Sequence, residues 1–435
     1  MLLKLLFLLL NITLWVNISG AQELEHADIN TLRLVHAIWR HGDRTPSILL
    51  PTDPANGINS WPLGLGELTK RGIQQEFKLG QFLRKRYDGF LSQDYSPFEV
   101  YVRSSDYNRT LASGQAVLSG IFPIHGEELW VPIPVHTVPK PLDTLLYDRV
   151  LCPIADAERQ VIYSSNPEIL KISKDNENML RFLAEKSGST KIPLPLREIW
   201  FLFDPLFAIS CHNESHKLPD WVNSTVQSEI WRLYDISSNF MYYTDLLKRL
   251  RGGPLLKDIL NRMQLKISGI LDKRLKFYAF SGHDTSISAL LNAFGITVNI
   301  FPHYSTALFV ELHEIGNQFV VKLFYKSQTD STFVEPLVIP GCEKNCTVEK
   351  LFELRKHVIP DNWEVECGLK HWYSFTSEFY LLIICFLSLL CAIFLGCLLN
   401  TKMVHKRRRN TFELKETPSG AHLLSGDDED IDGGL

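Results

Sequence analysis

One stretch near the carboxyl end determines on which side of a membrane most of this chain must fold. Residues 379–399 form a mostly apolar run without a single charged side chain. A helix of that length crosses the ~30 Å hydrocarbon core of a bilayer, and the basic segment HKRRR follows it at 405–409. Because basic flanks stay on the cytoplasmic side, the sequence predicts a single-pass type I protein with residues 400–435 in the cytosol. A buried core helix is the alternative, but the length of the run and the basic stop argue against it.

The amino-terminal segment predicts a secretory signal peptide over residues 1–21. It holds one lysine and a mostly apolar run, and a small-x-small site ends at Ala21, after which we expect cleavage. A retained signal anchor is the alternative, although Asn11 and Asn17 interrupt its apolar run. Residues 22–378 are then expected in a lumenal or extracellular compartment, in a lysosome or endosome or at the cell surface.

Cysteines and glycosylation sequons agree with that route. Three of the eight cysteines fall in the apolar run, and five lie in the part where disulfides persist, namely Cys152, Cys211, Cys342, Cys346 and Cys367. Since five is odd, at least one of them is free or pairs between chains. Sequons predict glycosylation at Asn213, Asn223 and Asn345. A fourth sequon, at Asn108, adjoins a candidate site residue, and we expect no sugar there.

Strands alternate with helices along the chain, which indicates an α/β protein with a parallel or mixed sheet. Apolar or β-branched runs predict strands at 31–38, 98–103 and 275–280, an extended segment at 131–138, and two neighbouring strands in TALFVELHE and QFVVKLFY. Helical patterns occupy 69–87, 106–122 with Asp106 as its cap, and 285–294. The mostly helical stretch at about 155–270 is expected to form a smaller insertion domain.

Three clusters of charged residues each follow a predicted strand. RHGDR follows the first strand, RSSD begins at Arg103 after the second, and SGHD follows the strand at 275–280. Ligands of open α/β sheets bind at the carboxyl ends of the strands, so we expect these clusters to converge. The assembled set comprises three arginines, two histidines and one carboxylate, namely Arg40, Arg44, Arg103, His41, His283 and Asp284.

Three arginines around two histidines predict a site for phosphate. Guanidinium groups match phosphate geometry and stay charged at any relevant pH. Arginines that flank His41 disfavour the imidazolium ion and keep this histidine neutral and nucleophilic. The same charges would neutralise the phosphoryl oxygens during attack. Asp284 is then the candidate to protonate the leaving oxygen.

Other interpretations of these clusters are weaker. Each cluster alone has a structural explanation: an Arg–His pair is often a surface or capping feature, and an aspartate before a helix is often only an N-cap. His41, His283 and Asp284 could ligate a metal, but three nearby arginines would repel a dication. No GxSxG motif supports a serine hydrolase. A net charge of -4 gives no argument for nucleic acid.

At these residues the chain resembles the histidine acid phosphatases, and within them the lysosomal and prostatic branch. RHGDRTP resembles the family signature, YVRSSDYNRT and SGHDTS its second and third blocks, and PTDP, PIPVHTVP and VIPGCEKNC that branch. The similarity spans about residues 31–367. It implies a phosphoglycerate-mutase-like fold, a mixed sheet flanked by helices with a smaller helical insertion. It implies no cofactor and no metal.

The resemblance also implies a role for each candidate residue. His41 would be the nucleophile that forms a phosphohistidine, and Asp284 the general acid. The remaining residues would hold the phosphate: Arg40, Arg44, Arg103 and His283. A homodimer is implied too, with Trp61 in a segment near its interface.

The family pattern further implies the disulfides Cys152–Cys367 and Cys342–Cys346. The usual third disulfide would join Cys211 to a residue near 306–307, where this chain has threonine and alanine, so we expect Cys211 to be unpaired. The predicted tail contains no tyrosine, and its HLL at 422–424 lacks the acidic residue of a dileucine signal. A tyrosine-based lysosomal sorting signal therefore cannot operate here.

The sequence thus favours an acid phosphatase that hydrolyses phosphate monoesters. One alternative keeps this chemistry but narrows the substrate to an inositol phosphate, a lysophospholipid or a nucleotide. Another is a catalytically silent surface protein that uses the pocket to bind a ligand, although both His41 and Asp284 are present.

Overall fold

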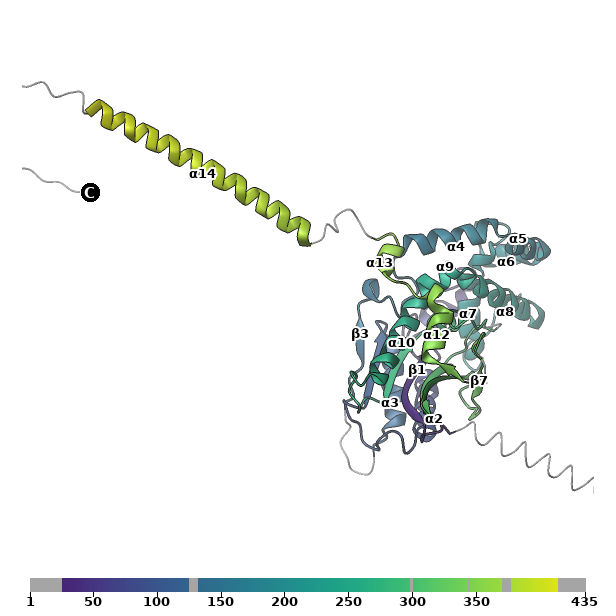
Figure 1. Ribbon diagram of the computed structural model, residues 1–435. Coiled ribbons are helices and arrows are strands. Elements are labelled where there is room, and N and C mark those ends of the chain that lie inside the picture. The colour runs from purple at the N-terminus through teal and green to yellow at the C-terminus, as the bar shows by residue number, and fades with distance from the viewer. Residues whose placement is uncertain (1–25, 125–131, 298–299, 343–344, 370–376, 414–435) are drawn as a thin grey trace, which may run out of the picture. The chain divides into compact units, whose positions relative to one another are not determined.

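The computed structural model consists of two units, residues 1–369 and 370–435. It describes residues 26–124, 132–297, 300–342, 345–369 and 377–413 (Figure 1). The expected signal peptide and the HLL segment lie outside these described residues.

Within the described residues of the first unit, eight strands form one sheet, in the order β3-β2-β4-β1-β5-β6-β7 with β8 beside β6. Their bounds are β1 Leu32–Arg40, β2 Val100–Ser105, β3 His136–Val138, β4 Phe277–Gly282, β5 Ala307–Ile315, β6 Gln318–Lys326, β7 Glu335–Leu337 and β8 Cys346–Thr347. The pairs β3-β2, β2-β4 and β4-β1 are parallel, and the pairs from β1 onward to β8 are antiparallel.

The helices of this unit fall into an amino-terminal pair, a middle group and a carboxyl-terminal group. Their bounds are α2 Lys70–Arg86, α3 Asn108–Ile121, α4 Pro153–Ser165, α5 Pro167–Asp175, α6 Glu177–Ser187, α7 Trp200–Cys211, α8 Ser224–Asn239, α9 Asp245–Leu247, α10 Gly253–Ile267, α11 Asp284–Ala293, α12 Val348–Arg355 and α13 Trp363–Glu366.

This architecture confirms the predicted mixed α/β fold, with two local corrections. Of the segment expected to be extended at 131–138, the structure describes residues 132–138, and among these only His136–Val138 form a strand. The expectation that Asp106 caps the next helix is wrong, because α3 begins at Asn108 and its N-cap is Tyr107. Strand β2 continues to Ser105 and a turn follows it, so the helix starts later than the position of Asp106 suggested.

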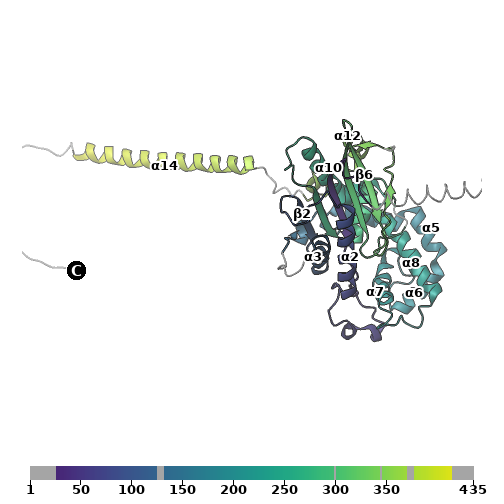
Figure 2. The ribbon, with the colours of Figure 1, turned by 90° about the horizontal axis from the view of Figure 1, so that it is seen from below.

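The alternation of side chains along β1 explains why helices cover both faces of the sheet. Leu34 and Ile38 point into a core shared with α10, α11 and α12. Val35 and Trp39 point to the opposite face, where α2 and α3 pack. Figure 2 shows the strands between these two groups of helices. Because both faces of β1 are buried, its sequence is a nearly continuous apolar run.

The middle helices build a core of their own beside the sheet (Figure 1). Residues such as Ile162, Leu206 and Ile230 meet in this second core. The helix α10 falls within the stretch 155–270, but it packs in the core against the sheet. Helices α4 to α8, the helical insertion, share this second core, and residues of α4, α7 and α8 line the same cavity as His41, which follows β1.

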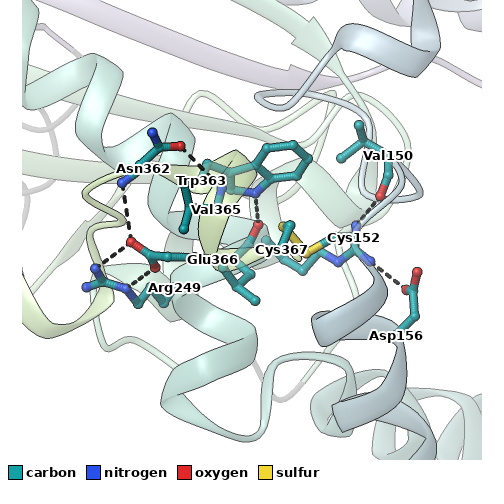
Figure 3. Close-up of a disulfide and its surroundings, with 11 residues drawn as sticks. Val150, Cys152, Asp156, Arg249, Asn362, Trp363, Val365, Glu366 and Cys367 are labelled. Carbon is teal, nitrogen blue, oxygen red and sulfur yellow. Dashed lines mark hydrogen bonds and ion pairs between the residues drawn. A yellow bond between two sulfur atoms is a disulfide. The ribbon is translucent and has the colours of Figure 1, made fainter. Parts of the chain in front are cut away.

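Two disulfides are present in the first unit. Cys152, directly before α4, is joined to Cys367 after α13 (Figure 3). The second disulfide joins Cys342 to Cys346, so both pairs are those that the resemblance implies. Cys211 is free, as expected from the missing partner.

In the second unit the described residues form one helix, α14 Ser377–Glu413. Its part from Phe379 to Arg409 contains an 18-residue window with a mean hydropathy of 3.0 and is long and apolar enough to cross a membrane. It contains Cys385, Cys391 and Cys397, all free.

Candidate active site

Sheet order brings the three charged clusters together. Strand β4 lies between β2 and β1, with Arg40 opposite Gly282 and Ser104 opposite Ser281. The backbone N–H of His41 donates to the carbonyl of Gly282, 3.0 Å away. The segments that follow β1 and β4 therefore leave the sheet side by side, which places His41 and His283 with ring centroids 5.5 Å apart.

The turn after His41 is shaped by close backbone packing against α2. A Cβ on Gly42 would lie 2.4 Å from the carbonyl oxygen of Gly72, so only glycine fits. The next residue, Asp43, accepts a hydrogen bond from the hydroxyl of Thr69, the N-cap of α2, and its Oδ2 lies 2.7 Å from His212 Nε2. This carboxylate therefore holds the turn in place and is not among the cavity-lining residues.

The ring of His41 is held in one tautomer. Its Nδ1 lies 2.8 Å from the carbonyl oxygen of Gly42. A carbonyl can only accept, so Nδ1 carries the proton and Nε2 keeps the lone pair. The side chain is buried and lines a cavity of about 950 Å³. This arrangement leaves a neutral imidazole with a free nucleophilic nitrogen.

The cluster after β4 contributes an imidazole and a carboxylate. His283 is the N-cap of α11, and its Nε2 lies 2.9 Å from the hydroxyl of Ser105. Asp284 is the first residue of the helix, and its Oδ1 accepts from the backbone N–H of Thr285 at 2.7 Å. Both side chains line the cavity. A helix N-terminus favours an anion, so this end of α11 suits both a carboxylate and a phosphate.

The three predicted arginines have different surroundings. Arg40 donates to the carbonyl of Pro302 at 2.6 Å, pairs with Asp284 at 2.9 Å, and lies over the ring of Tyr304. Arg44 lines the cavity and is ion-paired with Asp204 at 2.5 Å.

The third arginine, Arg103, is bound by the buried Asp143 at 2.5 Å. Neither Arg103 nor Arg40 is among the cavity-lining residues. Of the six predicted residues, His41, Arg44, His283 and Asp284 therefore line one cavity, while Arg40 contacts that group through Asp284.

A fourth arginine, which was not among the predicted residues, also lines the cavity. It is Arg109 on α3, and burial together with the charge of Arg44 lowers its pKa to about 10. Its Nε is buried without a hydrogen-bond partner among the described residues. The signal was available, because Arg109 stands in the block YVRSSDYNRT only six positions after Arg103. It also adjoins Asn108, which lines the cavity and donates to Glu67.

The histidines are kept neutral mainly by burial. Burial lowers the pKa of His41 well below its usual value, and the charges of Arg109, Arg40 and Arg44 lower it further. The same causes lower the pKa of His283. The flanking arginines thus act as the sequence suggested, but desolvation is the larger effect.

The family model for the histidine phosphatase superfamily (branch 2) matches residues 31–326. The chain belongs to this family. It is therefore a histidine acid phosphatase, a hydrolase of phosphate monoesters, as the sequence predicted.

Relatives of this histidine acid phosphatase match most of its length. Putative acid phosphatase 5 of Caenorhabditis elegans is 39% identical, over 97% of this chain and 100% of the relative. The human lysosomal acid phosphatase is 34% identical over 92% of each chain. The human prostatic acid phosphatase is 35% identical, over 80% of this chain and 90% of its own.

Solved structures confirm the fold of the acid phosphatase. The apo form of Hafnia alvei phytase superposes with a TM-score of 0.61 at 18% identity, covering 78% of this chain and 98% of the phytase. The phytase from Citrobacter braakii gives 0.59 at 17% identity, with coverage of 78% and 99%.

Proposed function

We propose that this acid phosphatase works through a phosphohistidine on His41. The observation that carries the proposal is the 2.8 Å contact between His41 Nδ1 and the Gly42 carbonyl, which leaves Nε2 unprotonated. In the first step Nε2 attacks phosphorus, the N–P bond forms and the ester P–O bond breaks. In the second step water attacks the phosphohistidine, releases inorganic phosphate and restores the free imidazole.

The phosphate would be held by cations around His41. Arg44 and Arg109 both line the cavity, and their mutual repulsion favours an anion between them. We assign Arg40, Arg103 and His283 to the same task. To contact phosphate, Arg40 and Arg103 must exchange part of their bonding to Asp284 and Asp143.

Asp284 is proposed as the general acid and, in the second step, the base. It gives its proton to the leaving alkoxide and then takes one from the attacking water, so that the cycle is closed. Its position at the cavity beside His283 supports this role. Asp106 is another carboxylate that lines the cavity, and a leaving-group comparison of variants can separate its role from that of Asp284.

We propose that the catalytic unit lies outside the cytosol and is anchored by α14. The apolar part of this helix and the following basic residues support a type I arrangement. The three predicted glycosylation sites, Asn213, Asn223 and Asn345, are all exposed. Asn223 caps α8 through its Oδ1, which leaves Nδ2 available for a glycan.

A homodimer is proposed around the segment that contains Trp61. The Trp61 ring itself is buried and stacks on His216 at 3.9 Å, so it would support the surface from below. Its neighbours Ile58 and Leu63 are more than half exposed and would meet the partner. Sedimentation of the detergent-solubilised protein tests this: a monomer at micromolar concentration contradicts it.

The test of the proposed chemistry is to trap the intermediate. The full-length protein is mixed with a ³²P-labelled monoester and quenched in alkali, in which phosphohistidine survives, and the label is mapped to a peptide. Label on His41, absent from a folded His41→Ala variant that has lost at least about 10³-fold in turnover, is the expected result. A folded His41→Ala variant with substantial turnover would show that another residue is the nucleophile.

A further inference from the structure

One face of helix α4 forms part of the cavity wall. Asp156, Arg159, Gln160 and Tyr163 all line the cavity, and their spacing places them on the same side of the helix. The chemistry described above uses none of them. This wall belongs to the helical insertion and not to the sheet that carries His41.

Arg159 is the positively charged residue of this wall. Its Nε and Nη2 are buried and have no hydrogen-bond partner in the part of the chain that the structure describes. The side chains one turn away on either side are committed elsewhere. Asp156 is ion-paired with Arg251 at 2.6 Å, and the hydroxyl of Tyr163 donates to the carbonyl of Ser237 at 2.6 Å. Buried donors without acceptors are destabilising, so this guanidinium is suited to an acceptor that arrives with a ligand.

A second arginine connects this wall with the catalytic residues. Arg149 lines the cavity, and its charge contributes to the lowered pKa of His283. Its guanidinium carbon lies 5.3 Å from the ring centroid of Trp200. The described residues include no hydrogen bond or ion pair that would neutralise it. Positive charge therefore continues from the phosphate site toward Arg159.

Asp148 is a carboxylate that also lines this side of the cavity. It interacts electrostatically with Arg159 and Arg149, but no ion pair within the described residues joins it to either of them. Burial raises the pKa of Asp148. In an acidic compartment this carboxyl consequently holds a proton more readily than an exposed aspartate does, and it repels an anion less.

The position of Arg159 is fixed by the start of its helix. The buried disulfide Cys152–Cys367 lies directly before α4, and Arg251 bonds both Asp156 and the carbonyl of Val150 (Figure 3). A side chain on a rigid helix holds the substrate group that it binds at a constant distance from the reacting atoms. The wall can thus select substrates by the spacing of their charged groups.

We propose that Arg159, assisted by Arg149, binds a second oxyanion of the substrate. Preferred substrates are then phosphate monoesters that carry a second phosphate or a carboxylate at a defined distance. A guanidinium group binds such oxyanions through two parallel hydrogen bonds. The inference rests on the proposed function, because it takes the first phosphate to be at His41.

The experiment measures kcat/KM of the full-length protein in detergent. The substrates are the monophosphates and bisphosphates of alkanediols whose chains contain three, four or six methylene groups. For at least one length we expect kcat/KM of the bisphosphate to exceed that of the monophosphate by about tenfold, beyond the factor of two for its two ends. Arg159→Gln should reduce this ratio toward two, and Arg159→Lys should retain part of it. Arg181→Gln, an exposed arginine of α6 paired with Glu177, is the matched control and should leave the ratio unchanged.

Two outcomes would overturn the second oxyanion site. One is a wild-type ratio near two at every length, and the other is an Arg159→Gln variant that loses the same factor on both substrates. If Arg159→Gln does not fold, the wild-type ratio and Arg159→Lys decide. A failure of the phosphohistidine mechanism can be recognised separately. Calorimetry measures the affinity of the bisphosphate for His41→Ala and for the double variant His41→Ala with Arg159→Gln. This comparison does not depend on turnover, so it tests Arg159 even if His41 is not the nucleophile.

Discussion

Arg40 Nη2 and Asp284 Oδ2 form an ion pair of 2.9 Å between the end of β1 and the first residue of α11. The side chains are only 4% and 18% exposed, so little water competes with the pair. The arginine next to the proposed nucleophile is thus bound to the proposed acid. In the proposed mechanism, a phosphate that takes over Arg40 would release Asp284, and substrate binding would thereby be coupled to the availability of a proton donor.

Asp284→Asn is predicted to slow alkyl phosphates far more than aryl phosphates. An alkoxide with a pKa near 15 departs slowly unless it is protonated, and a general acid contributes about 10²–10⁴-fold. Nitrophenolate leaves without help, so p-nitrophenyl phosphate should lose much less. Single-turnover rates on both substrates measure this, because hydrolysis of the phosphohistidine does not then mask the first step.

Asp106→Asn is the matched control for that variant, since Asp106 also lines the cavity. Equal losses of Asp284→Asn on both substrates would assign Asp284 a positioning role. A leaving-group dependence that appears only in Asp106→Asn would move the acid to that residue.

Arg109→Gln is predicted to move the acid limb of kcat/KM to higher pH. The proposed mechanism requires neutral His41, and after burial the charge of Arg109 is the next largest cause of the lowered pKa of this histidine. Removing a nearby positive charge favours imidazolium, so the pKa rises and activity is lost at a higher pH as the solution is acidified. The pH profile of kcat/KM reports this pKa in the free enzyme.

Arg109→Lys keeps the charge and is the control for that limb. It should lower kcat/KM through poorer phosphate contact while leaving the limb near its wild-type position. A limb that does not move in Arg109→Gln would contradict an electrostatic effect of Arg109 on His41.

Cys211 is predicted to be a slow thiol in the folded protein. Burial, together with the nearby Asp43, raises its pKa to about 11, so little reactive thiolate is present at neutral pH. Alkylation followed by peptide mapping should label Cys211 slowly before denaturation and rapidly after it. Label at Cys152 or Cys367 without a reductant would contradict the disulfide between them.

Loss of the Cys152–Cys367 disulfide is expected to destabilise the first unit. The bond closes a loop with a sequence separation of 215 residues, for which chain entropy alone corresponds to about 5 kcal/mol. Cys152→Ser should therefore lower the midpoint of thermal unfolding in a circular-dichroism melt. Cys211→Ser is its control, and an unchanged midpoint in Cys152→Ser would show that the surrounding contacts suffice.

The type I topology predicts which side the tail faces. An epitope attached after Leu435 should be inaccessible from the lumenal or extracellular face until detergent is added. An epitope on the catalytic unit should be accessible from that face throughout. Access of antibody or protease to the C-terminal epitope in intact cells would reverse the orientation.

Local patterns in the sequence were sufficient for the strands, the family and most of the site. Alternating or continuous apolar runs predicted β1, β4, β5 and β6. Such strands can be recognised because the pattern of apolar residues within a segment indicates which of its faces are buried. Charged residues at strand ends predicted that His41, His283 and Asp284 meet, because parallel strands present their carboxyl ends at one edge. The apolar run that became α14 needed only its length and its lack of charge.

The tertiary structure alone decided which charges neutralise one another. Nothing in the spacing of the sequence indicates that Asp204 binds Arg44, that Asp143 binds Arg103, or that Arg159 is left without a partner. These relationships depend on the strand order and on how the helices of the insertion fold over the sheet. Because an ion pair acts over a few ångströms in space and not along the chain, only the folded arrangement determines which guanidinium groups remain available to a substrate.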